Sequence, residues 1–299
     1  MKFLPLIFFL LSLQNLFCEE VQPPANPPSA SAPLPWHMVN LWWTLPETEN
    51  FESYEMEVII DGEIDPSKIN LYIAPIGLGQ LNGAKFYGGL QTNTGGFPAA
   101  DPSPEYVPGN SKAAIFSRWG DKGIDRSYVR TAVDGFFEAA DYEGDFASGR
   151  RPYEWTNGHY IFSLRKMDFE RDSEGKEWTW VGAYATDVST GISTFISALK
   201  FPGKTLTLGS AHSSFIEIYG GKEVVIADLP KLQVQIGAPR INGKRLPMNE
   251  LRVIFPKAGQ TASPAIMTAE LSEDKQYVVC TLHNEILQRK EWKYPLPQE

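Results

Sequence analysis

Apolar and polar residues alternate one by one along much of the chain after residue 36. The segment YEMEVIID, residues 54–61, is the clearest example, with Glu55 and Glu57 standing between apolar side chains. A period of two is typical of a strand that buries only one face. Further segments with strand character are HYIFSLRK at 159–166 and WTWVGAYAT at 178–186, which the charged turn Asp168–Lys176 joins into a predicted pair of strands.

Many short strands without intervening helical segments favour an all-β fold. For a chain of 299 residues, they predict an antiparallel β-sandwich, a jelly roll of the concanavalin type. The core of the sandwich is expected over residues 36–220. Residues 221–299 are expected either to complete the sandwich or to form a small C-terminal β-module.

The N-terminus has the composition of an export signal. Lys2 is followed by the apolar run Phe3–Leu13, and Cys18 precedes two acidic residues. We predict a signal peptide over residues 1–18 and hence a secreted, extracytoplasmic protein. A lipid anchor on Cys18 is the alternative. Residues 19–35 include six prolines, which predicts an extended Pro-rich linker.

Charge and composition narrow the range of partners. The chain has 36 acidic and 27 basic residues, for a formal net charge of −9, and no basic run. This balance argues against nucleic acid and against an anionic membrane surface as partners, and no later apolar run is long enough to predict a transmembrane segment. The four histidines show no metal-binding spacing, and no nucleotide-binding loop is present. The sequence therefore predicts no cofactor.

The segment KFYGGLQTN, residues 85–93, combines a strand pattern with two adjacent glycines. Counting by two, Tyr87, Gln91 and Asn93 share one side with Gly89. Glycine inside a strand marks a bulge or a close approach by another group. Two interpretations are open: the glycines form a simple bulge, or they leave a shallow polar groove for a flat ligand.

Aromatic residues are plentiful, at 12% of the chain, which suits β-sandwiches and sugar-binding surfaces alike. Trp178, Trp180 and Tyr184 share one face of a predicted strand. This face either belongs to the core or forms an open platform for sugar rings. Trp155 lies in the polar segment YEWTNG, which predicts an exposed anchor.

Carboxylates suggest two further kinds of site. Asp141, Glu143 and Asp145 alternate in DYEGD, which indicates either a solvated acidic loop or a calcium site built from oxygen ligands. Glu55 and Glu57 share a strand face at a spacing of about 7 Å. That spacing is compatible with glycoside hydrolysis by two carboxylates, and equally with the solvent-facing side of an amphipathic strand.

Four segments together resemble domain-of-unknown-function family 3472: FYGGLQTN at 86–93, IFSRWG at 115–120, residues 143–166, and WTWVGAYATD at 178–187. The matching residues are Tyr87, Gly89, Gln91, Phe116, Ser117, Trp119, Glu143, Gly144, Tyr153, Trp155, Gly158 and Tyr160. The chain departs from the family pattern at Gly120 and Asp145. The resemblance implies a secreted, concanavalin-like β-sandwich often found beside sugar-related modules, and it implies no particular reaction.

These features together predict a secreted β-sandwich that binds a carbohydrate or glycan without an evident catalytic motif. Aromatic rings would stack on sugar rings while amide and carboxylate groups bind hydroxyls. The predicted ligand-binding residues are Tyr87, Gln91, Asn93, Trp119, Glu143, Arg151 and Trp155. One alternative is a glycoside hydrolase or polysaccharide lyase that uses Glu143 or the pair Glu55 and Glu57. The other is a structural or adhesive surface module.

Overall fold

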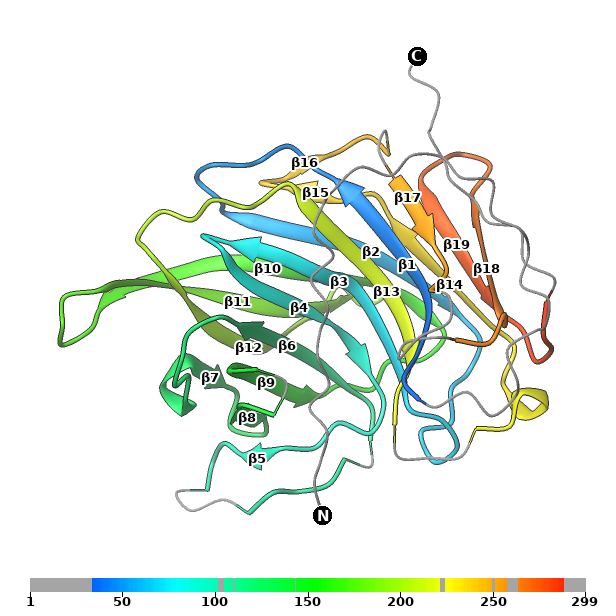
Figure 1. The fold of residues 1–299 in the computed structure, drawn as a ribbon, viewed down its shortest axis with the longest axis horizontal. Coiled ribbons are helices and arrows are strands. Elements are labelled where there is room, and N and C mark those ends of the chain that lie inside the picture. Colours follow the sequence, from blue (N-terminus) through cyan, green and yellow to red (C-terminus); the bar gives the residue numbers. More distant parts are fainter. Residues whose placement is uncertain are drawn as a thin grey trace.

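The computed structural model describes residues 34–101, 105–109, 111–142, 144–220, 224–248, 251–256 and 263–287. The predicted signal peptide and nearly all of the predicted linker lie outside these residues. The chain forms two large β-sheets that pack face to face (Figure 1). Every strand pairing within them is antiparallel. The prediction of an all-β antiparallel sandwich is therefore confirmed.

Sheet A has nine strands. In spatial order they are β17 (Leu251–Ile254), β1 (Trp36–Thr44), β13 (Ala211–Ile218), β3 (Leu71–Leu81), β4 (Ala84–Gln91), β6 (Ala113–Trp119), β9 (Phe146–Pro152), β8 (Phe136–Ala140) and β5 (Phe97–Pro98).

Sheet B has ten strands. Eight follow one path: β18 (Met267–Leu271), β19 (Tyr277–Leu282), β14 (Leu232–Gly237), β2 (Ser53–Asp61), β10 (Gly158–Arg171), β11 (Glu177–Asp187), β12 (Ser193–Pro202) and β7 (Val129–Thr131). The hairpin of β15 (Arg240–Ile241) and β16 (Lys244–Arg245) attaches to β2. Two 3-10 turns, η1 (Arg126–Tyr128) and η2 (Ile226–Asp228), lie in the connections.

The strands that the structure describes after residue 220 belong to the two main sheets and do not form a separate sheet of their own. In sheet B, β14 pairs with β2 and with β19. In sheet A, β17 pairs with β1. Among the described residues, no helix has the length and apolar character needed to cross a membrane.

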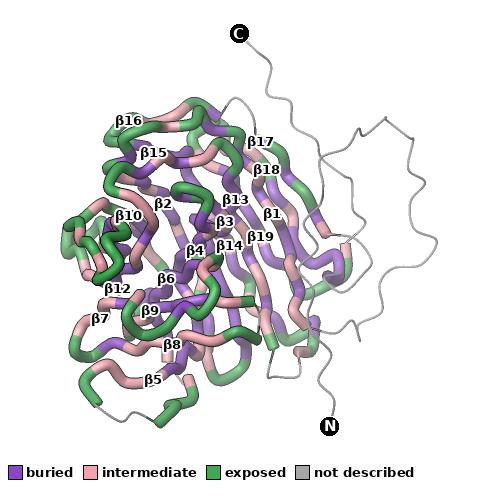
Figure 2. Tube along the Cα trace, turned by 60° about the vertical axis from the view of Figure 1, so that its left-hand side comes forward, coloured by how far each residue is buried: buried purple, intermediate pink, exposed green. Residues whose placement is uncertain are grey.

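The alternation in β2 has the predicted consequence. Tyr54, Met56 and Val58 are fully buried, while Glu55 and Glu57 lie on the outer face of the sheet. Figure 2 shows the same pattern throughout, with buried positions concentrated in the strands and exposed ones in the connections. A fully buried residue of this size stabilises the fold by roughly 1.5–3 kcal/mol.

Aromatic rings and glycines set the distance between the sheets. Phe86 of β4 meets Phe201 of β12 with ring centroids 5.9 Å apart. At Gly88, an added Cβ would lie 2.6 Å from the Phe162 ring of sheet B, and at Gly149 it would lie 2.3 Å from Ser197 Cβ. Any side chain at these two positions would push the sheets apart.

The second glycine of the pair, Gly89, faces away from the core and contacts the neighbouring strand. An added Cβ would lie 2.2 Å from the carbonyl oxygen of Ile73 and 2.8 Å from Pro75 Cδ. The register of β3 shifts twice beside it, so a bulge in β3 brings that backbone close. The interpretation of Gly89 as an open groove is therefore wrong, because the protein's own chain fills the place.

Candidate functional site

The outer face of sheet A has a second aromatic cluster, separate from the core between the sheets. Because Phe86 and Gly88 point inward, Tyr87 and its neighbours of the same parity point outward. We call the outward rings the aromatic belt. It consists of His37, Tyr72, Tyr87, Trp119, Tyr142, Phe146 and Phe215.

Ring contacts run through the whole belt. The centroid distances are 5.6 Å for His37–Phe215, 5.2 Å for Phe215–Tyr72, 5.6 Å for Tyr72–Tyr87, 4.6 Å for Tyr87–Trp119, 6.0 Å for Trp119–Phe146 and 5.2 Å for Phe146–Tyr142. All fall in the range favoured by aromatic pairs. Tyr87, Trp119 and Phe215 are only half-buried, and Tyr142 is exposed. Solvent therefore reaches several rings of the belt.

A row of polar groups crosses the same face. Tyr87, Ser117, Ser148 and Glu138 are register partners on β4, β6, β9 and β8. The Ser117 hydroxyl donates to Ser148 Oγ at 2.8 Å, and the Tyr142 hydroxyl donates to Glu138 at 2.5 Å. The row gives the aromatic belt a hydrogen-bonding flank.

Arg150 joins this row to the loop that precedes β5. Its Nη2 lies 2.5 Å from Glu138 Oε2, and its Nη1 donates to the Gly95 carbonyl at 2.6 Å. Burial alone would lower the pKa of Arg150, but the Glu138 carboxylate raises it above the ordinary value. The two side chains thus form an ion pair on a largely covered part of the face.

Tyr72 lies toward the other end of the belt. Its register partners are Glu217 on β13 and Gln91 on β4. Its side chain is buried, which raises the pKa of the phenol well above the ordinary value, and Tyr87 and Glu217 add to that effect. His37 Nε2 lies 3.6 Å from Glu217 Oε1, and burial lowers the pKa of His37.

Three of the predicted ligand-binding residues share this face. Tyr87 and Trp119 form its closest ring pair, and Gln91 lies beside Tyr72. Glu143 lies outside the described residues. Asn93 adopts a left-handed φ of 52°, and its amide donates to the Pro66 carbonyl at 2.5 Å and to Asn70 at 2.6 Å. Its amide donors bridge two loops, so it helps to shape the edge of the face.

Arg151 points the other way. It is adjacent to Arg150, and successive side chains of a strand lie on opposite faces. Arg151 contacts Asp134 at 2.9 Å and donates to the Phe195 carbonyl at 2.8 Å. Arg151 therefore does not share the face of Tyr87 and Trp119, whereas Arg150 lies on the belt side of the sheet.

Trp155 is not an exposed anchor, and that prediction is wrong. Only 1% of the residue is accessible, and it packs within the main core. Its indole N–H donates to the Gln91 carbonyl at 3.4 Å, and the Lys112 ammonium lies 4.9 Å from the ring centroid. Its polar sequence neighbours concealed a position that distant parts of the chain cover.

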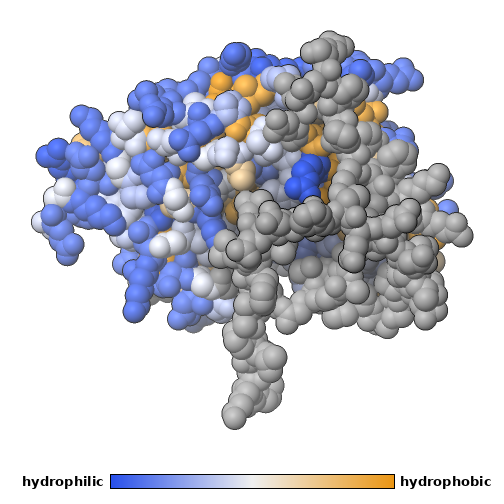
Figure 3. Space-filling view, turned by 45° about the horizontal axis from the view of Figure 1, so that its top comes forward, coloured by the Kyte–Doolittle hydropathy of each residue, from blue (hydrophilic) through white to orange (hydrophobic). Residues whose placement is uncertain are grey.

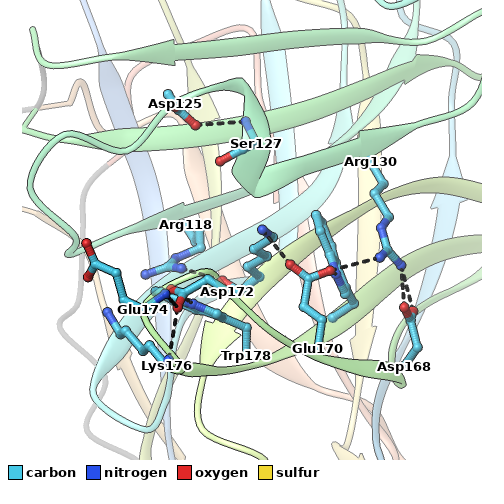
Figure 4. A network of polar contacts seen from close by, with 12 residues as sticks. Arg118, Asp125, Ser127, Arg130, Asp168, Glu170, Asp172, Glu174, Lys176 and Trp178 are labelled. Carbon is cyan, nitrogen blue, oxygen red and sulfur yellow. Dashed lines mark hydrogen bonds and ion pairs between the residues drawn. The ribbon is translucent and has the colours of Figure 1, made fainter.

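The other predicted aromatic surface is sealed. On β11, Val181, Ala183 and Ala185 face the core, so Trp178 and Trp180 point outward. Both are nevertheless buried, because the extended β10–β11 hairpin and β7 place charged side chains against them. Figure 4 shows those around Trp178.

We call this covering the hairpin network. It consists of Arg130, Asp168, Glu170 and Asp172 together with the two tryptophans, and its charged groups pair with the indoles and with one another. Trp180 donates to Glu170 at 2.7 Å and Trp178 donates to Asp172 at 2.8 Å. The Arg130 guanidinium lies 3.8 Å from the Trp180 ring centroid and binds Asp168 at 2.6 Å. No indole face is left for a ligand ring, so the open-platform interpretation of these two tryptophans is wrong.

The carboxylates considered for catalysis or metal binding have partners elsewhere. Glu57 accepts from the Tyr277 hydroxyl at 2.6 Å and lies 3.4 Å from His159, while Glu55 lies 3.6 Å from Arg240. These contacts are on the outer face of sheet B. In the calcium candidate, Asp145 accepts from the Gly123 N–H at 2.9 Å. Among the described residues, no group of three His, Cys, Asp or Glu side chains is arranged to hold a metal ion.

Most residues of this face were not among the predicted ligand-binding residues; examples are Tyr72, Glu138, Arg150, Phe215 and Glu217. For Phe215 a pattern was available, since Phe215, Glu217 and Tyr219 alternate with isoleucines in FIEIY. Tyr72 had no comparable sign, because its strand is apolar on both faces.

Comparisons with known proteins add little. No protein-family model matches the sequence, and no relative is found among curated proteins. Among solved structures, scytalido-glutamic peptidase with a transition-state analogue inhibitor is similar at a TM-score of 0.39 and 9% identity, over 83% of this chain and 98% of that one. The same peptidase with a peptide-based transition-state analogue gives a TM-score of 0.40 at 9% identity, over 83% and 100%. Likeness at this level transfers no activity to this chain.

Proposed function

We propose that the aromatic belt of sheet A binds a carbohydrate, and that the protein is an extracytoplasmic carbohydrate-binding β-sandwich. The half-exposed pair of Tyr87 and Trp119 carries this proposal. Sugar rings have apolar C–H faces that stack on such rings.

Polar groups on the same face as the pair suit the rim of a sugar, which carries hydroxyls. Gln91 and Glu217 are part-exposed and can accept hydrogen bonds, while the Arg150 guanidinium is a donor. Few charges of one sign gather on the face, since Glu138 and Arg150 neutralise one another. More generally, hydrophilic residues dominate the left-hand part of the surface in Figure 3, and apolar ones emerge in patches toward its upper middle.

An extracytoplasmic location is supported by the sequence alone, through the charged start and apolar run of residues 1–13. The resemblance to domain-of-unknown-function family 3472 also rests on the sequence alone and stays a prediction.

Binding is best tested by titration calorimetry with a panel of neutral and acidic oligosaccharides. We expect Trp119→Ala to weaken the binding of the best ligand about tenfold or more, because a stacked aromatic is commonly a major contributor to affinity. Phe169→Ala is the matched control, since Phe169 is a part-exposed aromatic on the β10–β11 hairpin, away from the belt.

Three outcomes separate this proposal from its rivals. Equal loss in both variants would argue against the belt as the binding face. Release of shortened saccharides, abolished by Glu57→Gln, would favour a glycoside hydrolase or lyase. Absence of binding together with concentration-dependent self-association would favour a structural or adhesive module.

A further inference from the structure

One hydroxyl of the belt has no hydrogen-bond partner in the part of the chain that the structure describes. Tyr72 is only 3% accessible, and its phenolic oxygen is buried and unpaired. The ring is fixed between Phe215 and Tyr87. Buried hydroxyls are normally paired, because leaving one unpaired costs stability.

The residues on either side of Tyr72 are suited to a second hydroxyl. Register pairing puts Glu217 on one side and Gln91 on the other. An ionised carboxylate only accepts hydrogen bonds, a phenol donates and accepts, and an amide does both. A sugar hydroxyl can donate to the carboxylate and accept from the phenol at the same time.

We propose that Tyr72, Gln91 and Glu217 form the hydroxyl-recognising end of the belt and select a neutral sugar unit over one that carries a carboxylate or sulfate. This inference rests on the proposed carbohydrate-binding function.

Charge gives the reason for the selection. An anionic sugar group beside Glu217 meets a like charge, which is unfavourable in a poorly solvated site. Arg150, the nearby cation, is already bound to Glu138. A neutral hydroxyl meets no such penalty. Gln91, Glu217 and Tyr87 are themselves part-exposed. Side chains at such positions change rotamer rapidly, and on this proposal such a change gives the ligand access to the Tyr72 hydroxyl.

The decisive variant is Tyr72→Phe, which removes only the hydroxyl. We expect binding of the neutral oligosaccharide preferred by the wild type to weaken about tenfold, as measured by titration calorimetry. The melting temperature should stay the same or rise, because the hydroxyl has no internal partner to lose.

Tyr54→Phe is the matched control. Tyr54 also has a buried and unpaired hydroxyl, but it lies in the core between the sheets. The same substitution there should leave the affinity unchanged. Glu217→Gln should in turn improve the binding of a uronic-acid oligosaccharide several-fold relative to the neutral one.

The possible results distinguish the two levels of the proposal. If the wild type binds saccharides and Tyr72→Phe binds them equally well, the inference fails and the proposed function stands. If the wild type binds neither neutral nor acidic saccharides, both fail. A melting temperature several degrees lower in Tyr72→Phe would show that the hydroxyl serves the fold, and would also overturn the inference.

Discussion

Both sheets present tryptophan side chains outward, but Trp119 on sheet A keeps its ring half-exposed, whereas Trp178 and Trp180 on sheet B are covered. On sheet A, Tyr87 and Trp119 contact each other with their rings tilted by 47°, and both stay half-exposed. On sheet B, Trp178 and Trp180 have no more than 3% of their surface accessible. The difference comes from the long β10–β11 hairpin, whose carboxylates accept from both indoles. An outward aromatic is therefore a binding candidate only when no neighbouring segment supplies its partners.

The largest contrast is expected in stability. Trp180→Ala should lower the free energy of unfolding by about 3–5 kcal/mol, the usual cost of truncating a buried Trp. Urea denaturation followed by circular dichroism measures this. A loss below about 1 kcal/mol would mean that the hairpin network does not hold the indole in solution.

Acid should affect the two halves of the molecule at different pH. His212, in the core behind the belt, packs against Phe86 and Tyr54, and burial lowers its pKa to about 4. The unfolded chain, with a histidine pKa of about 6.5, binds the proton first, so stability is lost as the pH falls from about 6.5 to about 4. The total loss is about 3 kcal/mol.

The hairpin network should persist further into acid. The hydrogen bond from Trp178 lowers the pKa of Asp172, and the hydrogen bond from Arg130 lowers the pKa of Asp168. The contribution of these two carboxylates to stability is therefore lost only as the pH falls below the ordinary value of about 4. Urea titrations at several pH values give the free energy of unfolding as a function of pH. Its decrease between about pH 6.5 and about pH 4 should be smaller in His212→Gln than in the wild type. The same slope in wild type and variant would contradict this assignment.

A smaller effect should follow from uncovering the indole without removing it. Arg130→Met keeps an apolar chain but loses the cation over Trp180 and the bond to Asp168. We expect a loss of about 1 kcal/mol and stronger quenching of tryptophan fluorescence by acrylamide. Arg165→Met is the control, because Arg165 lies over Tyr184 rather than over an indole.

The smallest effect on stability is expected on the open side. Trp119→Ala should cost about 1 kcal/mol or less, since a half-exposed ring loses little burial. Urea denaturation beside Trp180→Ala gives the comparison. A cost equal to that of Trp180→Ala would show that Trp119 is part of the packing rather than of a binding face.

Local alternation was enough to predict the sandwich, because a period of two fixes which side chains are buried wherever one face is polar. In β2 the glutamates mark the outer face without ambiguity. In β9, with the sequence FASGRRP, small residues occupy both faces and the inward side cannot be assigned. The local pattern therefore does not decide which of Arg150 and Arg151 lies on the belt side.

The solvent exposure of individual side chains could not be predicted from the sequence. The partners that cover Trp155 and Trp180 include Lys112 and Arg130, which are far from them along the chain. The belt itself joins Tyr72 to Phe215, and no local pattern relates these positions. Side-chain cover depends on which strands become neighbours, and this is decided only by the whole topology.

The position of β1 and β2 inside their sheets has a consequence for how the protein is made. β1 pairs with β13 and β17, and β2 pairs with β10 and β14. A ribosome must release about a hundred further residues before β2 meets β10, and more than that before β1 meets β13. Such a high contact order slows folding and leaves strand edges open to aggregation. The nascent chain therefore exposes unpaired strand edges until its later sheet strands emerge.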